Sequence, residues 1–175
     1  MIREFDQNGL DKARFQAEVF EESLTKTSVS SPVFLRRFFS SDYVVKFDDT
    51  PGELFLYDSN DAFYQIEKQY GKSNYGKIKY NPEGLYWLGY LTRYICYTRN
   101  IYSILLYKLF DVKQIYSLYN SYHTQSEEWC LNRLLCQYGY TEDDLDINKR
   151  LKRAIQRYTD CEANYKITDA KHHIK

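Results

Sequence analysis

The sequence predicts an all-α fold, in which seven to eight helices form a single compact domain (residues 1–175) around a tyrosine-rich central helix. The chain of 175 residues contains only seven Gly and three Pro, so few positions interrupt a helix. Its length is sufficient to bury a hydrophobic core without metal or disulfide support, and its aromatic fraction of 18% disfavours disorder. Helix-capping residues recur before apolar segments of helical period and divide the chain into elements.

The first part of the chain is expected to form three helices and one loop. The first helix covers about residues 10–26, with Asp11 in its opening turn. Ser31, followed by proline, is a predicted N-cap that begins a short helix with four apolar positions at helical spacing. Residues 48–60 are expected to form a loop with a short extended piece. Asn60 or Asp61 then caps a third helix, which ends near residue 70.

The central helix is expected to begin at Asn81, where a cap is again followed by proline, and to end at about Thr98. On a helical wheel the apolar arc consists of Trp87, Leu88, Leu91 and Ile95, and the adjacent arc consists of Tyr86, Tyr90, Tyr94 and Tyr97. Together these arcs cover more than half of the circumference. A helix with so wide an apolar surface is surrounded by other helices.

Three further helices are expected at about residues 101–110, 111–122 and 126–138. Asp111 and Ser126 are the caps of the last two, and glutamates follow Ser126 in the first turn. A final basic helix is expected from about residue 142 to about residue 160.

The charges are segregated although the net charge is zero. Residues 1–69 carry 8 basic and 13 acidic side chains, whereas residues 70–125 carry 7 basic and 2 acidic ones. A neutral total argues against generic, phosphate-driven binding of nucleic acid. The uneven distribution still allows a local basic patch, or an internal contact between an acidic and a basic part of the chain.

Sequence features of export, membrane insertion and catalysis are weak. The longest apolar stretch is too short and too polar to span a bilayer, and the first residues lack the apolar core of a signal peptide. We therefore expect a cytoplasmic protein with reduced, packed cysteines and no membrane association. His123 is the one histidine in the body of the chain, and we expect it to bond nearby backbone. We predict no catalytic residue, no metal site and no cofactor.

Two basic segments are candidates for nucleic-acid binding. The first is a tyrosine-bearing loop without acidic neighbours, whose rings could stack on unpaired bases. The second is the outer face of the last helix, although acidic neighbours there favour simple solvation. The residues concerned are Lys72, Tyr75, Lys77, Lys79 and Tyr80 in the loop, and Lys149, Arg153 and Arg157 in the helix.

The tyrosines of the central helix are the candidates for protein binding. Twelve of the nineteen tyrosines fall between Tyr70 and Tyr122. Tyrosine and arginine are enriched at contact hot spots, but aromatic residues at helical spacing also build cores. Two alternatives therefore remain, a core seam or a partly exposed binding surface. The candidate contact residues are Tyr86, Tyr90, Arg93, Tyr94, Tyr97 and Arg99.

Several motifs resemble a family of small helical proteins. The motifs are FLRRFF, YGKIKY, YWLGYLTRYICYT and YHT, and they fall within residues 28–136. The family occurs in Gram-positive bacteria and their mobile elements and is catalogued as candidate antitoxins of toxin–antitoxin loci. The acidic first helix and the basic last helix look like additions to this core.

The resemblance implies a non-enzymatic protein that neutralises a protein partner, a toxin or a host defence nuclease, by binding it. An inhibitor of host defence encoded by a bacteriophage, such as an anti-CRISPR protein, would also neutralise its partner by binding it. The acidic first third could then imitate phosphate charge, while the lysine loop could touch guide RNA. The alternative is an RNA- or DNA-binding protein that uses the lysine loop and the last helix.

Overall fold

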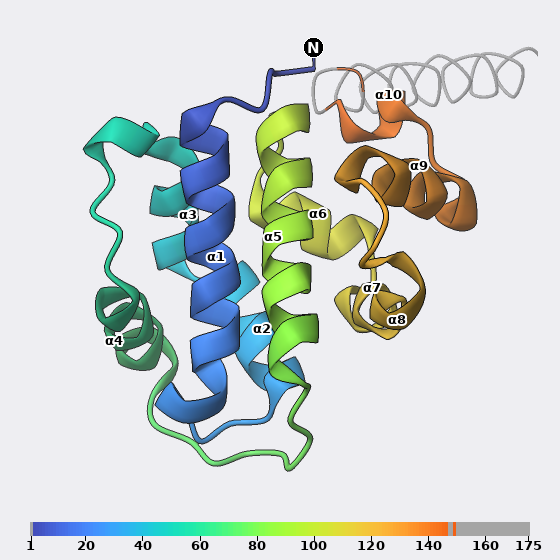
Figure 1. Cartoon of the computed structure of the whole chain (residues 1–175). Helices are drawn as coiled ribbons and strands as arrows, with labels where there is room; N and C mark the ends of the chain where they lie inside the picture. Colours follow the sequence, from blue (N-terminus) through green and yellow to red (C-terminus); the bar gives the residue numbers. More distant parts are fainter. Residues whose placement is uncertain (1, 147–148, 150–175) are drawn as a thin grey trace, which may run out of the picture.

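The computed structural model describes residues 2–146 and 149 and confirms the all-α fold (Figure 1). Within these residues the chain forms ten α-helices and one 3₁₀ turn, and no β-strand. In order, they are α1 (Gln7–Lys26), α2 (Ser31–Phe39), α3 (Asp42–Asp49), the 3₁₀ turn η1 (Gly52–Leu54), α4 (Ser59–Tyr70), α5 (Pro82–Arg99), α6 (Ser103–Leu109), α7 (Val112–Ser117), α8 (Tyr119–Tyr122), α9 (Glu127–Tyr138) and α10 (Glu142–Leu145).

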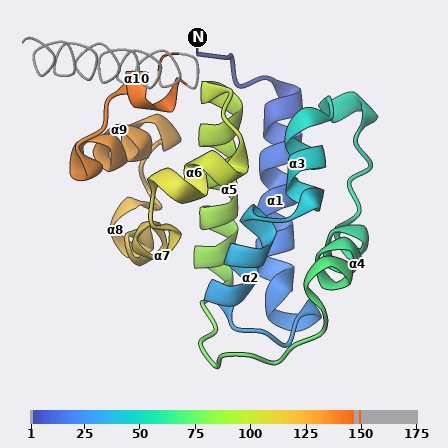
Figure 2. The same cartoon turned by 180° about the vertical axis from the view of Figure 1, so that it is seen from behind.

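The two longest helices, α1 and α5, lie side by side and run in opposite directions through the molecule (Figure 1). Helices α2, α3 and α6 cover one side of this pair, as the view from behind shows (Figure 2). The pair packs closely at Gly89, where a Cβ atom would lie 2.7 Å from the Cα atom of Ala17. Glycine at this position therefore allows the two helix backbones to touch.

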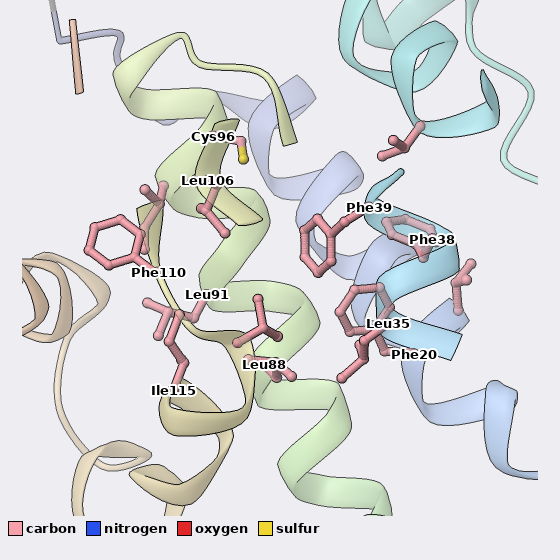
Figure 3. Packing of buried hydrophobic residues seen from close by; sticks show 14 of the residues in the cluster. Phe20, Leu35, Phe38, Phe39, Leu88, Leu91, Cys96, Leu106, Phe110 and Ile115 are labelled. Carbon is pink, nitrogen blue, oxygen red and sulfur yellow. The ribbon is translucent and has the colours of Figure 1, made fainter. Parts of the chain in front are cut away.

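The hydrophobic core lies between the α1–α5 pair and the helices behind it. Figure 3 shows side chains of α1, α2, α5, α6 and α7 meeting in one cluster. Leu88, Leu91 and Ile95 are buried, as the helical wheel predicts. Trp87 was expected with them but is only half-buried. Its ring instead meets the edge of Tyr119, because this position turns toward α8.

Three predicted caps are confirmed by hydrogen bonds. The Asn81 side chain accepts from the amide of Gly84 at 2.6 Å. Asp111 and Ser126 cap α7 and α9 in the same way, through the backbone amides two and three residues further on. These bonds satisfy donors that the first turn of a helix leaves unpaired.

Other boundaries differ from the expectation. Helix α1 begins earlier because Asp6 caps it. Helix α2 has its N-cap at Ser30, one residue before the predicted Ser31. Helix α4 is capped by Asp58, not by Asn60 or Asp61.

Two elements were not foreseen. Helix α3 falls where no helix was expected, and it begins at Ser41, whose hydroxyl accepts from the amide of Val44 at 3.2 Å. The 3₁₀ turn η1 begins the loop in which a short extended piece was expected, and Phe55 directly after η1 has extended backbone angles. The expected helix at residues 111–122 is divided at Leu118 into α7 and α8.

The C-terminal part of the expected basic helix lies outside the described residues. Helix α10 covers only its first turn, and Lys149 follows, whereas Arg153 and Arg157 belong to the part that the structure does not describe. Among the described helices, none has both the length and the apolar character that a membrane span needs.

Candidate interaction surfaces

A stripe of tyrosines follows α5 on the side opposite its buried leucines. Tyr86, Tyr90 and Tyr94 are spaced four residues apart, which places them in one row along the helix, and all three are half-buried. In Figure 1 no described helix lies in front of α1 and α5, whereas α2, α3 and α6 lie behind them. The intermediate burial of the three tyrosines shows that solvent reaches part of the stripe.

The upper end of the stripe is closed by the N-terminal segment. The ring of Phe5 packs edge-on against Tyr90, Tyr94 and Tyr97. Tyr97 is only 7% exposed, and its hydroxyl donates a hydrogen bond to Asp6. Burial, together with this bond to a carboxylate, raises the pKa of Tyr97 to about 12. Tyr97 is thus part of the core seam, and the exposed stripe consists of the other three tyrosines.

Acidic side chains border the stripe. Tyr94 donates its hydroxyl to Glu128 at 3.1 Å, and Tyr90 lies in the field of Glu127 and Arg14. Burial raises the pKa of both tyrosines, and the neighbouring glutamates add to this effect. The hydroxyls therefore stay neutral hydrogen-bond donors at neutral pH.

Helix α1 supplies the other border. Its positions 14, 18, 21 and 25 are exposed and share one face, and Arg14 on that face acts on Tyr90. The same row carries two glutamates, and a third stands three residues before Tyr86. We call this surface the Tyr–Glu face, and it consists of Tyr86, Tyr90, Tyr94, Arg14, Glu18, Glu21, Glu83 and Glu127.

The two candidate arginines do not lie on this surface. Arg93 is 2% exposed and is bonded to Gln16, Asp48 and Ser103. Arg99 is 7% exposed and joins α5 to α9 and α10 through Glu128 and Glu142. Both arginines were candidate contact residues for a protein partner. In the structure both guanidinium groups bond other side chains of the protein, so neither is available to a partner at this surface.

A second buried cation lies beside Arg93. Lys12 is 5% exposed, and its ammonium donates to the carbonyls of Phe47 and Thr50 at 2.6 and 2.7 Å. Burial, reinforced by the charge of Arg93, lowers the pKa of Lys12 to about 8. These bonds tie α1 to the end of α3, and with Arg93 they hold the α1–α5 pair in register.

The titration of Lys12 gives a testable pH dependence. The pKa of Lys12 is about 8 in the folded protein, below the ordinary value of 10.5. As pH rises, Lys12 therefore loses its proton in the folded protein before it does so in the unfolded chain. The cost of burying the charge is fully present below pH 8 and disappears between the two pKa values. Relative to Lys12→Met, the wild type should gain about 1–2 kcal/mol of unfolding free energy between about pH 7 and about pH 9.5. Urea denaturation of both proteins at each pH measures this gain, and a constant difference would contradict it.

The lysine loop is only partly free. Lys72, Tyr75 and Lys77 are exposed. Lys79, by contrast, donates to the carbonyl of Thr27 at 3.0 Å, and Tyr80 stacks on Tyr116 with ring centres 3.7 Å apart. The last two candidates therefore have structural roles in the fold. In the expected C-terminal helix, Lys149 is exposed but pairs with Asp143.

Cys96, Cys130 and His123 have structural environments, whereas Cys136 is exposed and so differs from the expected packed cysteines. Cys96 and Cys130 are buried free thiols, and burial raises their pKa values to about 12 and about 11. Protonated thiols are poor nucleophiles. The Nδ1 atom of His123 lies 2.8 Å from the carbonyl oxygen of Tyr119, as the backbone-bonding interpretation expects.

Comparison with protein-family models, curated protein sequences and solved structures finds no match to this chain. A function for the protein therefore rests on its own surfaces. The acidic border of the Tyr–Glu face was not foreseen from the sequence. The helical period of Arg14, Glu18 and Glu21 was a usable signal, but only the pairing of α1 with α5 places these residues beside the tyrosines.

Proposed function

We propose that this protein is a non-enzymatic interaction module that neutralises a protein partner by binding it through the Tyr–Glu face. The partner is a toxin or a host defence nuclease. The protein is accordingly an antitoxin-like protein or an inhibitor of host defence, such as an anti-CRISPR protein of a bacteriophage or another mobile element. Such partners act in the cytoplasm, where we expect this protein to be located.

One observation carries the proposal. Three half-buried tyrosines form a row along α5, and acidic side chains lie near them. Tyrosine offers a large rigid ring and a hydroxyl while losing little conformational entropy, which is why it is enriched at protein contacts. The buried Arg93 network keeps the row rigid, so little ordering cost is added on binding.

The charge of the face suggests the chemistry of the partner. Glu18, Glu21, Glu83 and Glu127 border the tyrosines, and Arg14 is the one cation of the face as defined above. Phosphates would be repelled by this border, whereas a basic protein surface would be attracted to it. Nucleases and many toxins bind nucleic acid in basic grooves. An acidic face with partly exposed rings could occupy such a groove and exclude the nucleic acid.

Site-directed photo-crosslinking tests this proposal. A photoreactive phenylalanine analogue would replace Tyr86 or Tyr90 in one pair of proteins and Tyr102 in a control. Tyr102 is suitable because it is 43% exposed and lies outside the Tyr–Glu face. In cells that carry the natural partner, both test positions should capture the same protein, and the control should not. The captured protein should have a basic surface, and its toxic or nuclease activity should fall when this chain is added.

Substitutions then test the face itself. Tyr90→Ala should weaken the complex about 10- to 100-fold, as expected for a central aromatic contact. Glu18→Lys combined with Glu21→Lys should weaken it mainly by slowing association, and added salt should reduce this difference. Lys113→Glu on α7 is the control and should bind normally. The proposal fails if the partner is captured equally at Tyr102, or if its activity is unchanged in the complex.

A further inference from the structure

A groove of about 680 Å³ lies where α4 and the loop after it meet the ends of α1 and α2. Figure 1 shows this loop running beneath the lower ends of α1 and α2 to the start of α5. The apolar floor of the groove contains Val29, Phe34, Phe63 and Ile66. The volume is in the range of small-molecule sites and is sufficient for one or two nucleotides.

The rim of the groove is cationic. Lys26, Arg37 and Lys72 line it, and Glu67 is the one carboxylate among the described lining residues. The Arg37 guanidinium is held in place, because it donates to the carbonyl of Gly71 at 3.0 Å and lies over the Tyr70 ring. A rigid guanidinium that keeps further donors free suits a phosphate group.

Aromatic rings lie next to these charges. Tyr64 lines the groove and is 60% exposed, and the rings of Phe34 and Phe63 pair at 5.8 Å in the floor. Tyr64 is the exposed ring among the three, and an exposed ring beside cations is the combination that binds unpaired bases. Each stacked base is worth about 1–3 kcal/mol when its ring is removed.

The adjoining loop is fixed by its backbone, which leaves its side chains available. The amides of Ser30 and Ser31 donate to the carbonyls of Tyr75 and Ile78 at 3.0 and 2.8 Å. Gly76 has a φ of +81° and lies against Ser30, where a Cβ atom would meet the serine hydroxyl at 2.4 Å. Tyr75 is 72% exposed, and Lys77 two residues later is exposed as well.

We propose that this groove binds a single-stranded segment of nucleic acid. One unpaired base lies on the apolar floor against Tyr64, and its phosphates contact Lys26, Arg37 and Lys72. The next nucleotide follows the loop toward Tyr75 and Lys77. The site shares no residue with the Tyr–Glu face. Binding of a protein partner and binding of single-stranded nucleic acid are therefore separate properties of this molecule.

Fluorescence anisotropy tests the site with the full chain. The probe is a labelled oligouridine or oligothymidine of about twelve nucleotides, compared with a blunt duplex of the same length and with a mononucleotide. The single strand should bind at least about tenfold more tightly than the duplex. Three phosphate contacts predict a slope of about −2 in a plot of log K against log salt concentration.

Variants assign the binding to the groove. Lys72→Glu and Tyr64→Ala should each weaken single-strand binding about tenfold or more. Both side chains are exposed, so these proteins should remain folded by circular dichroism. Lys113→Glu, the matched charge reversal on α7, and Tyr90→Ala on the Tyr–Glu face should bind as the wild type does.

Several outcomes would overturn the proposal. Equal binding of the strand, the duplex and heparin, with no effect of Tyr64→Ala, would indicate general attraction of polyanions. A mononucleotide that binds as tightly as the oligonucleotide would indicate a small-molecule site. Equal loss in Lys113→Glu, or no binding of the strand at low salt, would equally exclude the groove as a strand-binding site.

Discussion

Asp48→Ala is expected to lower the free energy of unfolding by about 3–5 kcal/mol. The Asp48 carboxylate accepts from the buried guanidinium of Arg93 and from the amide and hydroxyl of Ser103, both at 2.8 Å. Its side chain is 6% exposed and that of Arg93 is 3% exposed, so the pair is shielded from water. Alanine would leave the charge of Arg93 without its counter-ion. Urea denaturation followed by circular dichroism measures the loss.

Two further proteins make this experiment specific. Asp49→Ala removes the adjacent carboxylate, which is exposed and bonds Tyr102, and it should cost less than about 1 kcal/mol. Arg93→Met combined with Asp48→Ala should recover part of the loss, because the guanidinium charge is then removed together with its counter-ion. A loss in Asp48→Ala no larger than that in Asp49→Ala would contradict the role assigned to the buried pair.

The Arg93 network also shows where sequence reasoning reaches its limit. Helical period identified α5, its Asn81 cap and its two arcs, because these depend on neighbours within a few residues. The partner of Arg93 lies 45 residues away in α3, a helix that the sequence did not predict. In the sequence, an arginine beside tyrosines resembles a contact residue, because the carboxylate that binds it in the fold is far away along the chain. The same holds for Arg99 and Glu142, which are 43 residues apart.

The lysine loop was located correctly as an exposed basic segment, but its members have different roles. Lys79 and Tyr80 bond or stack on residues far away in the sequence, so their side chains stabilise the fold. The groove adds Lys26, Arg37 and Tyr64, which belong to three separate helices. No spacing along the chain joins these three residues, because the packing of α4 against α1 and α2 brings them together.

The helix packing behind both surfaces depends on one ring. Phe20 is fully buried and packs edge-on against Phe34, Phe38 and Phe39 of α2, with ring centres 4.9–6.0 Å apart. Phe20→Ala would leave a cavity between α1 and α2 and lose these ring contacts. The free energy of unfolding should therefore fall by about 3–5 kcal/mol.

Tyr64→Ala is the matched control for this experiment, since it removes a ring that is 60% exposed and should change the unfolding free energy by less than about 1 kcal/mol. Phe20→Leu should cost less than Phe20→Ala, because it fills most of the cavity. Urea denaturation of the three variants gives the order. Equal losses in Phe20→Ala and Tyr64→Ala would mean that α1 is not held to α2 by this cluster. If Tyr64→Ala loses little unfolding free energy, as expected, its fold is intact. A weaker binding of single-stranded nucleic acid by this variant can then be assigned to the groove.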